Sequence, residues 1–498
     1  MVYNSLVLLA SAILLLRFLQ KYLNLWHRHL PFPPGPTPYP FIGNFRDLPT
    51  KLPWLTYIEW GRQYGSDIVH ASALGQHIVV VNSIKTAGEL FEKRSYLYSS
   101  RPVITMVKLM GWESNVGFMP VGERWRKHRR MLQQHFRRDM SRNYHTVQMK
   151  KIRQLLQGLT AAVIMATLYG YEVQHGNDHF VALAEKAVQK VSQAVFPGAV
   201  AVNTFPILRH LPSWMPGAGF QRFAAESRQL SKEMREVPFE FVKQNMRDGV
   251  DSKSIVARLL EANQAQGHHD EAAIQEVAAV AYAAGSDTTA SALATFFLAM
   301  AVHPDIQKRA QSEIDTVIST ERLPEFEDRS SLPYVEALCR EVLRWKPVLP
   351  LGVAHASTED DIYNGYFIPK GTAVLSNIWA MTRDESIYSE PEQFNPDRFF
   401  TSDAKLNDDD SSSAFGFGRR ICVGRHLAGA TVWAGIVSVL STFTITKAKD
   451  ATGKEIDIDP DNYSDGLISH PLPFPCSIIP RSEAASSLVQ ATSETHDF

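Results

Sequence analysis

The sequence has few cysteines, almost no net charge and no segment with the composition of a linker. Three cysteines in 498 residues are too few for a disulfide scaffold or a cysteine-rich zinc site, and they are typical of a reducing compartment. Lys and Arg number 51 against 52 for Asp and Glu, so the net charge of -1 excludes bulk electrostatic binding of nucleic acid. With 45% hydrophobic residues the chain is globular, and we expect one large domain or two closely packed lobes.

Residues 1–30 have the pattern of a membrane anchor. The run from Leu6 to Leu16 is uncharged, and its apolar character continues to about Leu19, close to the ~20 residues that a spanning helix needs. Basic residues follow this run and none precedes it, so the positive-inside rule places the rest of the chain in the cytoplasm. The alternatives are a cleavable signal peptide, for which the basic start and the cleavage site are missing, and a buried helix. Residues 31–44 are proline-rich, which favours a stiff hinge over an ordinary irregular loop.

The rest of the chain predicts a mainly helical domain with a smaller sheet, over residues 45–481. Short apolar runs around a Gly turn predict strands up to about Ser83, and the pattern from 85 to 345 is mostly helical. Turn signals after Pro347 indicate a return to strand and loop, and a last helical block ends near Thr442. Residues 482–498 are rich in Ser, Ala and Thr, so we expect this tail to be disordered.

One predicted helix, from about Glu271 to Val302, is apolar on nearly every face. Such a helix is buried, either in a large core or in a bilayer. Its middle, residues 284–289, reads Ala-Gly-Ser-Asp-Thr-Thr and consists mostly of poor helix formers, whose hydroxyls can bond back to carbonyls and distort the helix. Burying Asp287 is costly without a function or a partner, so this stretch is a candidate site. A satisfied core aspartate and a transmembrane helix are the alternatives.

A glycine-rich loop, residues 415–424, precedes an apolar helical run. Its glycines permit the close backbone approach that a bulky planar ligand above the loop requires. Cys422 lies just before the start of a helix, where the partial positive charge favours the thiolate. A thiolate on such a loop suits an axial ligand of haem iron, whereas a lone cysteine is more often a small hydrophobic residue.

Several motifs along the chain resemble, in the same order, those of the cytochrome P450 family of haem-thiolate monooxygenases. The similarity covers roughly Pro33 to Arg481. The motifs are Trp125-x-x-x-Arg129, which resembles the haem-propionate helix; Ala284-Gly285-x-Asp287-Thr288-Thr289, the oxygen-activation motif; Glu341-x-x-Arg344 and Pro396-Asp397-Arg398-Phe399, the Glu-x-x-Arg pair and its following arginine segment; and Phe415-x-x-Gly418-x-Arg420-x-Cys422-x-Gly424, the haem-binding signature.

The resemblance implies a fold, a cofactor and residue roles. The fold would be mainly α (α+β), with a large helical lobe and a smaller β-rich lobe around a buried haem b. Cys422 would be the axial ligand of the iron, and Asp287 and Thr288 would be the catalytic residues. The implied contacts of the cofactor are Trp125, Arg129, His355, Phe415, Gly418, Arg420 and Gly424.

The same resemblance implies a structural network of Glu341, Arg344 and Arg398. Glu341 and Arg344 stand at i, i+3 on one helix and share a face, which allows a bidentate, largely buried arrangement with Arg398. The alternative is an exposed ion pair that contributes little to stability.

The activity implied is insertion of one oxygen atom from O2 into a hydrophobic organic substrate, a secondary metabolite or a xenobiotic. Electrons would come from NADPH through a separate cytochrome P450 reductase, because the chain has no second region for a flavin. The anchor and hinge resemble those of microsomal, fungal-type members, which implies an endoplasmic reticulum membrane with the catalytic domain facing the cytoplasm. The alternatives are an isomerase or dehydratase that acts on a peroxide without O2, and a non-catalytic haem protein. The presence of Thr288 favours the monooxygenase.

The helix of Trp125 predicts where a reductase docks. At ~100° per residue, Trp125 and Arg129 lie on one face, and a basic stripe lies on the opposite side. Such a stripe attracts an acidic flavoprotein, or is simply a solvated face. Its members are Arg126, Lys127, Arg130, Arg137 and Arg138.

Other segments carry weaker expectations. The apolar stretches from Val103 to Phe118 and from Phe196 to Trp214 are candidate linings of the substrate site, and the second is also a candidate for peripheral membrane attachment. The stretch between Phe136 and Tyr169 is about one helix shorter than the family usually has. His268 and His269 beside Asp270 are expected to form a solvated loop and not a metal site.

Overall fold

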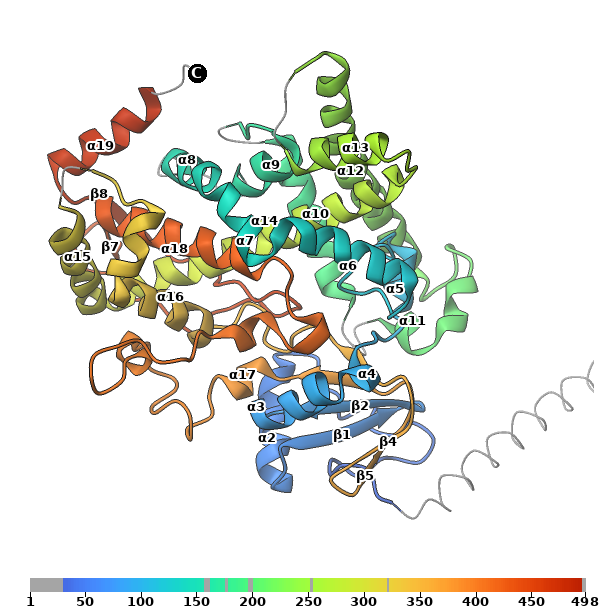
Figure 1. Ribbon diagram of the computed structural model, residues 1–498. Helices are drawn as coiled ribbons and strands as arrows, with labels where there is room; N and C mark the ends of the chain where they lie inside the picture. Colours follow the sequence, from blue (N-terminus) through green and yellow to red (C-terminus); the bar gives the residue numbers. More distant parts are fainter. Residues whose placement is uncertain are drawn as a thin grey trace, which may run out of the picture.

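A computed structural model describes residues 30–155, 162–174, 178–195, 200–250, 254–319 and 322–494. Helices form a large lobe, and a smaller lobe at one end contains most of the strands (Figure 1). This confirms the predicted mainly helical architecture with a smaller sheet. Residues 1–29, which include the predicted anchor, lie outside the described residues. Within the described ranges no single helix has the length and apolar composition to cross a membrane; α14 and α15 meet these criteria only as a pair bent by 106°.

The small lobe is built around a mixed four-stranded sheet in the order β1-β2-β6-β3. Strands β1 (Ile68–Ala73) and β2 (Gln76–Val81) form an antiparallel hairpin, and β2 pairs in parallel with β6 (Ala373–Ser376). The sheet therefore joins the early strands to the segment after the helical region. Smaller pairs are β4 (Asp361–Tyr363) with β5 (Tyr366–Ile368), and β7 (Phe443–Lys447) with β8 (Cys476–Pro480); β3 spans His355–Ala356.

The proline-rich segment 31–44 packs onto this sheet and is not a free hinge. The Pro34 carbonyl accepts a hydrogen bond of 2.9 Å from His70 N in β1, and the Pro31 carbonyl accepts one of 2.7 Å from Phe367 N in β5. The Phe32 ring stacks on His70, with ring centroids 4.8 Å apart. The sequence predicted a stiff hinge and did not predict these contacts, which come from strands far along the chain.

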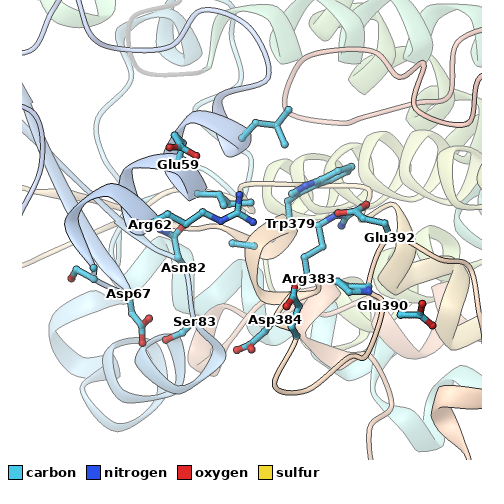
Figure 2. Close-up of a pocket in the computed structure, with 18 of the residues that line it drawn as sticks. Glu59, Arg62, Asp67, Asn82, Ser83, Trp379, Arg383, Asp384, Glu390 and Glu392 are labelled. Carbon is cyan, nitrogen blue, oxygen red and sulfur yellow. The ribbon is translucent and has the colours of Figure 1, made fainter.

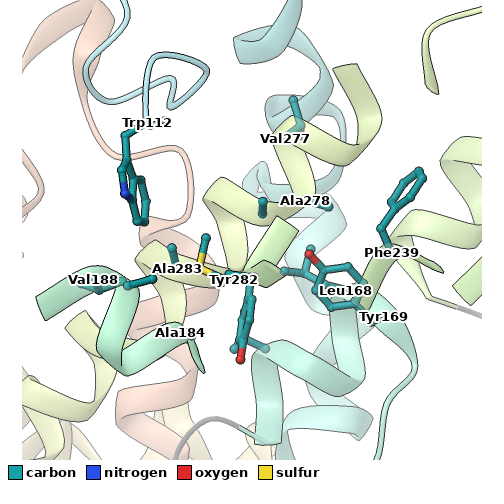
Figure 3. Close-up of a cluster of buried hydrophobic side chains, with 14 of the residues drawn as sticks. Trp112, Leu168, Tyr169, Ala184, Val188, Phe239, Val277, Ala278, Tyr282 and Ala283 are labelled. Carbon is teal, nitrogen blue, oxygen red and sulfur yellow. The ribbon is translucent and has the colours of Figure 1, made fainter. Parts of the chain in front are cut away.

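Helix α14 (Glu271–Val302) forms the centre of the large lobe and has the bounds that the sequence predicted. Figure 3 shows Tyr282 and Ala283 of α14 packed among side chains of its neighbours α9 and α10. The helix runs without a break through residues 284–289, where the hydroxyls of Ser286 and Thr288 bond back to the carbonyls of Ala283 and Ala284. The helices that pack on it include α6 (Glu123–Phe136), α9 (Ala162–Tyr169), α10 (His179–Ala194), α12 (Gly219–Arg247), α13 (Ile255–Ala265), α15 (Pro304–Ile318), α16 (Pro333–Trp345) and α18 (Arg425–Thr442).

Shorter helices complete the fold, and the last one corrects an expectation. Within the tail predicted to be disordered, residues 483–494 form α19 (Glu483–Glu494), and residues 495–498 lie outside the described residues. Ser482 caps α19 by accepting a hydrogen bond from Ala485 N at 3.1 Å, and Ala485 is buried where the helix packs on α18 and α8. The stretch between Phe136 and Tyr169 contains α7, α8 and α9. The bounds of the other helices are α2 (Pro53–Tyr64), α3 (Ile84–Ala87), α4 (Ser95–Tyr98), α5 (Thr105–Leu109), α7 (Arg138–Ser141), α8 (His145–Leu155), α11 (Ala201–Thr204) and α17 (Ile378–Met381).

Candidate functional site

Cys422 lies on a short loop immediately before α18, and hydrogen bonds hold its backbone at both ends. Its N–H donates to the Phe415 carbonyl at 2.8 Å, and its carbonyl accepts from Arg425 at 3.1 Å. Surrounding protein raises the pKa of the thiol above its ordinary 9.0, while the backbone N–H of Gly424 and the Arg129 guanidinium act in the opposite direction. The side chain is nevertheless accessible. An accessible thiol held this rigidly suits a metal ligand.

Gly418 has a packing role that the sequence argument did not identify. It has φ 54°, and a Cβ atom here would lie 2.0 Å from the carbonyl oxygen of Phe91. The glycine therefore lets the loop approach the π-helical turn Gly88–Lys93, which is a contact within the protein. At Gly424 a Cβ atom would meet only Cys422 Sγ, at 3.9 Å.

Arg420 points inward from the same loop and is buried. Its guanidinium donates to the carbonyls of Ser99 at 2.6 Å, Val116 at 3.1 Å and Met119 at 2.8 Å. The guanidinium carbon also lies 4.1 Å from the centre of the Trp125 ring, on α6. Trp125 and Arg420, which the sequence placed together only through the resemblance, are thus in direct contact.

Three further basic groups gather around Arg420. Arg129 of α6, half-buried, donates to the carbonyl of Ile421, the residue before Cys422. His355 of β3 is buried and its Nδ1 lies 2.7 Å from the Tyr98 carbonyl. The third group is Arg101, which the sequence analysis missed because an isolated arginine before a proline has no distinguishing pattern.

Arg101 is buried, and all its hydrogen bonds go to backbone carbonyls. They are those of Gly117 at 2.8 Å, Val353 at 2.7 Å and Ala354 at 3.0 Å. Burial and the neighbouring guanidinium groups of Arg420 and Arg129 hold the pKa of Arg101 well below its ordinary value. A buried guanidinium that is bonded only to neutral carbonyls needs an anion nearby to compensate its charge.

These four groups form a cationic cluster, defined as Arg101, Arg129, His355 and Arg420. Burial lowers the pKa of Arg420 to about 9 and that of His355 well below 6.5. Within the described ranges no carboxylate forms a salt bridge with any of them, and Arg129 Nε is buried without a hydrogen-bond partner. The cluster therefore has the donors and the charge that fit the two carboxylates of a haem, next to a cysteine that fits its iron.

The predicted carboxylate–arginine network is fully assembled. Glu341 and Arg344 are completely buried, and Arg344 donates to both carboxylate oxygens at 2.6 and 2.8 Å. Arg398 adds a third bond to Glu341 at 3.3 Å, and Asn395 N a fourth at 2.7 Å. The network ties α16 to the segment that leads into the Cys422 loop.

The acid and the alcohol of α14 both have partners; the sequence predicted that a hydroxyl here would bond back to a carbonyl of its own helix, but it did not predict the partner of the acid. Thr288 Oγ1 donates to the Ala284 carbonyl at 2.7 Å, one turn earlier. Asp287 Oδ1 lies 3.3 Å from Nε2 of His470, a residue of a distant hairpin. Ala284 is exposed although its helix is mostly buried, so this part of α14 also borders accessible space.

The basic stripe on α6 is only partly free. Its inner face buries Trp125 as predicted, together with His128, which pairs with Glu276 at 3.3 Å. On the outer face Lys127 pairs with Asp270, so Lys127 is less available than expected. The described carboxylates form no ion pair with Arg126 or Arg130. The other two predicted members lie beyond the end of α6: Arg137 pairs with Asp139, and Arg138, which no described carboxylate pairs with, begins α7. No group of His, Cys, Asp and Glu that could hold a metal ion occurs among the described residues, His268 and His269 included.

Two cavities of the molecule differ in the polarity of the side chains that line them. One of about 930 Å³ lies between α2 and the segment after α17, is lined by charged side chains such as Arg62, Arg383 and Glu392, and includes none of the predicted site residues (Figure 2). A smaller one, near Arg101, is mostly apolar and includes Ile104 and Phe118 from the first predicted lining segment. In the second segment Ile207 and Trp214 are exposed, at 73% and 79%, and residues 196–199 lie outside the described residues.

Comparison with known proteins gives a consistent result. The model of the family described as "Cytochrome P450" matches residues 33–476. Cytochrome P450 monooxygenase 208 of Postia placenta is 43% identical over 94% of this chain and 94% of its own length. Cytochrome P450 monooxygenase ple1 of Rhodocybe pseudopiperita is 42% identical, over 92% and 91%. Tryptamine 4-monooxygenase of Psilocybe cyanescens is 38% identical, over 91% and 93%.

Proposed function

Because this chain belongs to the cytochrome P450 family, a family of haem-iron monooxygenases, we propose that it inserts one oxygen atom from O2 into a hydrophobic organic substrate with electrons from NADPH. The balanced reaction is RH + O2 + NADPH + H⁺ giving ROH + NADP⁺ + H2O. The observation that carries the proposal is the accessible Cys422 beside four basic side chains, three buried and one half-buried, that have no carboxylate partner in the described part of the chain. The names of the relatives support the reaction class.

The cofactor in this proposal is haem b, which supplies the iron chemistry that activates O2. Cys422 Sγ would bind its iron, and the cationic cluster would bind its two carboxylates. The Trp125 indole and the Arg129 guanidinium would face them from α6, and Phe415 and Gly424 hold the loop in place through its backbone. Neutralisation of the cluster by two carboxylates would remove the unfavourable burial of its cations.

A CO-difference spectrum of the reduced protein tests this assignment. We expect the red-shifted Soret band of thiolate ligation in the wild type and its loss in Cys422→Ala. Cys476→Ala is the matched control, because Cys476 is half-buried in β8 and far along the chain from the loop. Retention of the band in Cys422→Ala, or its loss in the control alone, would contradict the assignment.

For the catalytic residues, the proposal assigns proton delivery to Asp287 and Thr288. The Thr288 hydroxyl directs its proton at the Ala284 carbonyl, so its oxygen is free to accept a hydrogen bond. A general acid must therefore supply protons from elsewhere, and Asp287 is adjacent. We expect Thr288→Ala to retain haem and to consume NADPH while releasing peroxide in place of product.

Turnover conditions distinguish the monooxygenase from its alternatives. A monooxygenase needs NADPH, a reductase and O2, and its product gains one atom of ¹⁸O from ¹⁸O2. An isomerase or dehydratase would convert an organic peroxide without any of them, and a non-catalytic haem protein would do neither. Incorporation of ¹⁸O that depends on NADPH is the result that supports the proposal.

The proposed electron donor is a separate NADPH–cytochrome P450 reductase, which would dock on α6. Arg126 and Arg130 border a groove of about 600 Å³ between α6 and α13, and neither pairs with a described carboxylate. Reversing both to Glu should slow reductase-driven reduction, with wild-type rates falling as salt rises. Arg46→Glu combined with Arg62→Glu, at two exposed positions in the small lobe, is the charge-matched control. Unchanged reduction in a haem-loaded double variant would place docking elsewhere.

A membrane location is also proposed, on the endoplasmic reticulum with the catalytic domain facing the cytoplasm. It is supported by the apolar run within residues 1–30 and by the exposed apolar side chains of Phe205, Ile207 and Trp214 between α10 and α12. Removal of residues 1–29 should release part of the protein from membranes, and Ile207→Glu with Trp214→Glu should release the rest. Extraction of the intact protein by alkaline carbonate would contradict the anchor.

The substrate class in this proposal is a hydrophobic secondary metabolite or xenobiotic. Support comes from the apolar lining around Ile104 and Phe118 in the small cavity near Arg101. One relative is named for tryptamine, a small amine, but a charged amine would need an acid, and Asp287 is already paired with His470. A library of uncharged ligands screened by the haem spin-state shift should give hits where cationic amines do not.

A further inference from the structure

A row of polar side chains runs along one face of the otherwise apolar helix α14. Asp287, Ser291 and Thr295 stand at i, i+4 and i+8, so they lie one above another. Each contacts the same hairpin, residues 462–472. Asp287 pairs with His470 at 3.3 Å; Ser291 Oγ donates to the Ser469 carbonyl at 2.6 Å; and Thr295 Oγ1 lies 3.1 Å from Tyr463 Oη.

The hairpin itself is tightly bonded, which fixes the position of His470. The backbone of His470 donates to Ser464 Oγ at 2.9 Å and accepts from Ser464 N at 2.7 Å. Tyr463 and Pro471 form a β-bridge, and the Leu472 N–H donates to the Asn462 carbonyl at 2.9 Å. The imidazole therefore meets the Asp287 carboxylate because two rigid elements bring them together.

The pair differs from its neighbours in exposure. The side chain of His470 is 33% exposed and that of Asp287 is 21% exposed, whereas Ser291 and Ser469 are buried. A contact in this row with a purely structural role would be buried from solvent, as the Ser291 contact is. An imidazole that reaches accessible space and a carboxylate can exchange protons with water and with each other.

We propose that His470 is a positioning residue that holds the Asp287 carboxylate and supplies it with protons. In each cycle the imidazolium gives its Nε2 proton to Asp287 Oδ1, and the neutral imidazole regains a proton from water. Asp287 then passes the proton on toward Thr288, whose own hydroxyl proton is occupied by the Ala284 carbonyl. This inference rests on the proposed monooxygenase function, because it concerns the source of the protons that O2 activation consumes.

Four single variants, with Asp287→Asn as the reference for the double variant, and one double variant of the full-length, haem-loaded protein test the inference. His470→Ala removes the pair, His470→Gln keeps a donor to Asp287 that cannot carry a proton, and Ser291→Ala removes a neighbouring anchor of the hairpin but leaves the pair intact. Asp287→Asn with His470→Ala tests whether His470 acts through Asp287. Every variant is first checked for the CO-difference band.

Two measurements separate a proton source from a structural anchor. The first is hydrogen–deuterium exchange of residues 462–472, which reports the order of the hairpin without any turnover. The second is product formed per NADPH consumed, with peroxide release, on a fluorogenic alkoxycoumarin that the wild type converts. We expect His470→Ala to lower this ratio about tenfold, less than the 10²–10⁴ of a direct general acid. His470→Gln should restore slow exchange but not the ratio, and Ser291→Ala should speed exchange but leave the ratio within about twofold of wild type.

The opposite pattern would overturn the inference. Recovery of the ratio in His470→Gln, or a loss in Ser291→Ala as large as in His470→Ala, would make His470 a structural anchor only. A further loss when His470→Ala is added to Asp287→Asn would show that His470 does not act through Asp287. If the wild type itself forms no NADPH-dependent product, the monooxygenase proposal fails and this inference with it. Normal wild-type turnover that His470→Ala leaves unchanged would remove only the role of His470.

Discussion

Replacing Glu341 by Gln is the most informative perturbation of the fold around the site. The substitution keeps the shape of the side chain and removes its charge. In the wild type the carboxylate accepts two bonds from Arg344 and one each from Arg398 and Asn395 N, in a completely buried position. In the variant, two buried guanidinium groups face a neutral amide. The NH2 group of this amide is a hydrogen-bond donor, and it would face the N–H groups that donated to the carboxylate.

The expected cost is large because the arginines remain buried. Removing one partner of a buried ion pair destabilises a protein by about 3–5 kcal/mol, since the remaining charge is left without compensation. Arg344 keeps its bonds to the Thr382 and Gln393 carbonyls, so it stays in place and cannot reach water. We therefore expect a loss near the middle of that range, read as a lower urea midpoint by tryptophan fluorescence, together with reduced haem incorporation on expression.

The matched control is an exposed pair in the same region. Arg309 and Asp397 are 2.7 Å apart but 55% and 50% exposed, so Asp397→Asn should cost about 0–1 kcal/mol. A Glu341→Gln variant whose urea midpoint equals that of Asp397→Asn would refute the reasoning. It would mean that the network contributes no more than a surface ion pair does.

Two further predictions concern backbone and pH. Gly418→Ala should lower the free energy of unfolding by about 1–2 kcal/mol for its left-handed φ and by about 1–3 kcal/mol more for the clash with the Phe91 carbonyl. Gly371 has φ 82° and open space around it, so Gly371→Ala should show only the first loss of stability. Urea unfolding measures both variants, and equal losses of stability would contradict the clash. Burial and the neighbouring His77 lower the pKa of His70 to about 3, so its protonation in the unfolded chain costs stability as pH falls below about 6.5. From pH 7 to 5 this amounts to about 2 kcal/mol, and His70→Gln should remove that part of the pH dependence; an unchanged dependence would show that His70 is not its source.

The sequence by itself determined the elements that depend on local pattern. An uninterrupted apolar stretch predicted α14 with its observed bounds, and the i, i+3 spacing placed Glu341 and Arg344 on one face of α16. The glycine-rich loop before α18 marked Cys422, because turn glycines and a helix start are properties of neighbours in the chain. Such features can be predicted without knowledge of the fold, because their physical causes act over a few neighbouring residues.

The tertiary structure alone decided the partners. Arg101 joins the cationic cluster, His470 meets Asp287, and Gly418 touches Phe91, and no local pattern indicated any of these contacts. The docking of the proline-rich segment on β1 and β5 and the folding of the tail into α19 were missed for the same reason. A residue's burial and its charged neighbours depend on segments that the chain brings back from far away, and these set the cost of an unpaired cation or acid. Which polar groups must find a partner is therefore a property of the packed molecule.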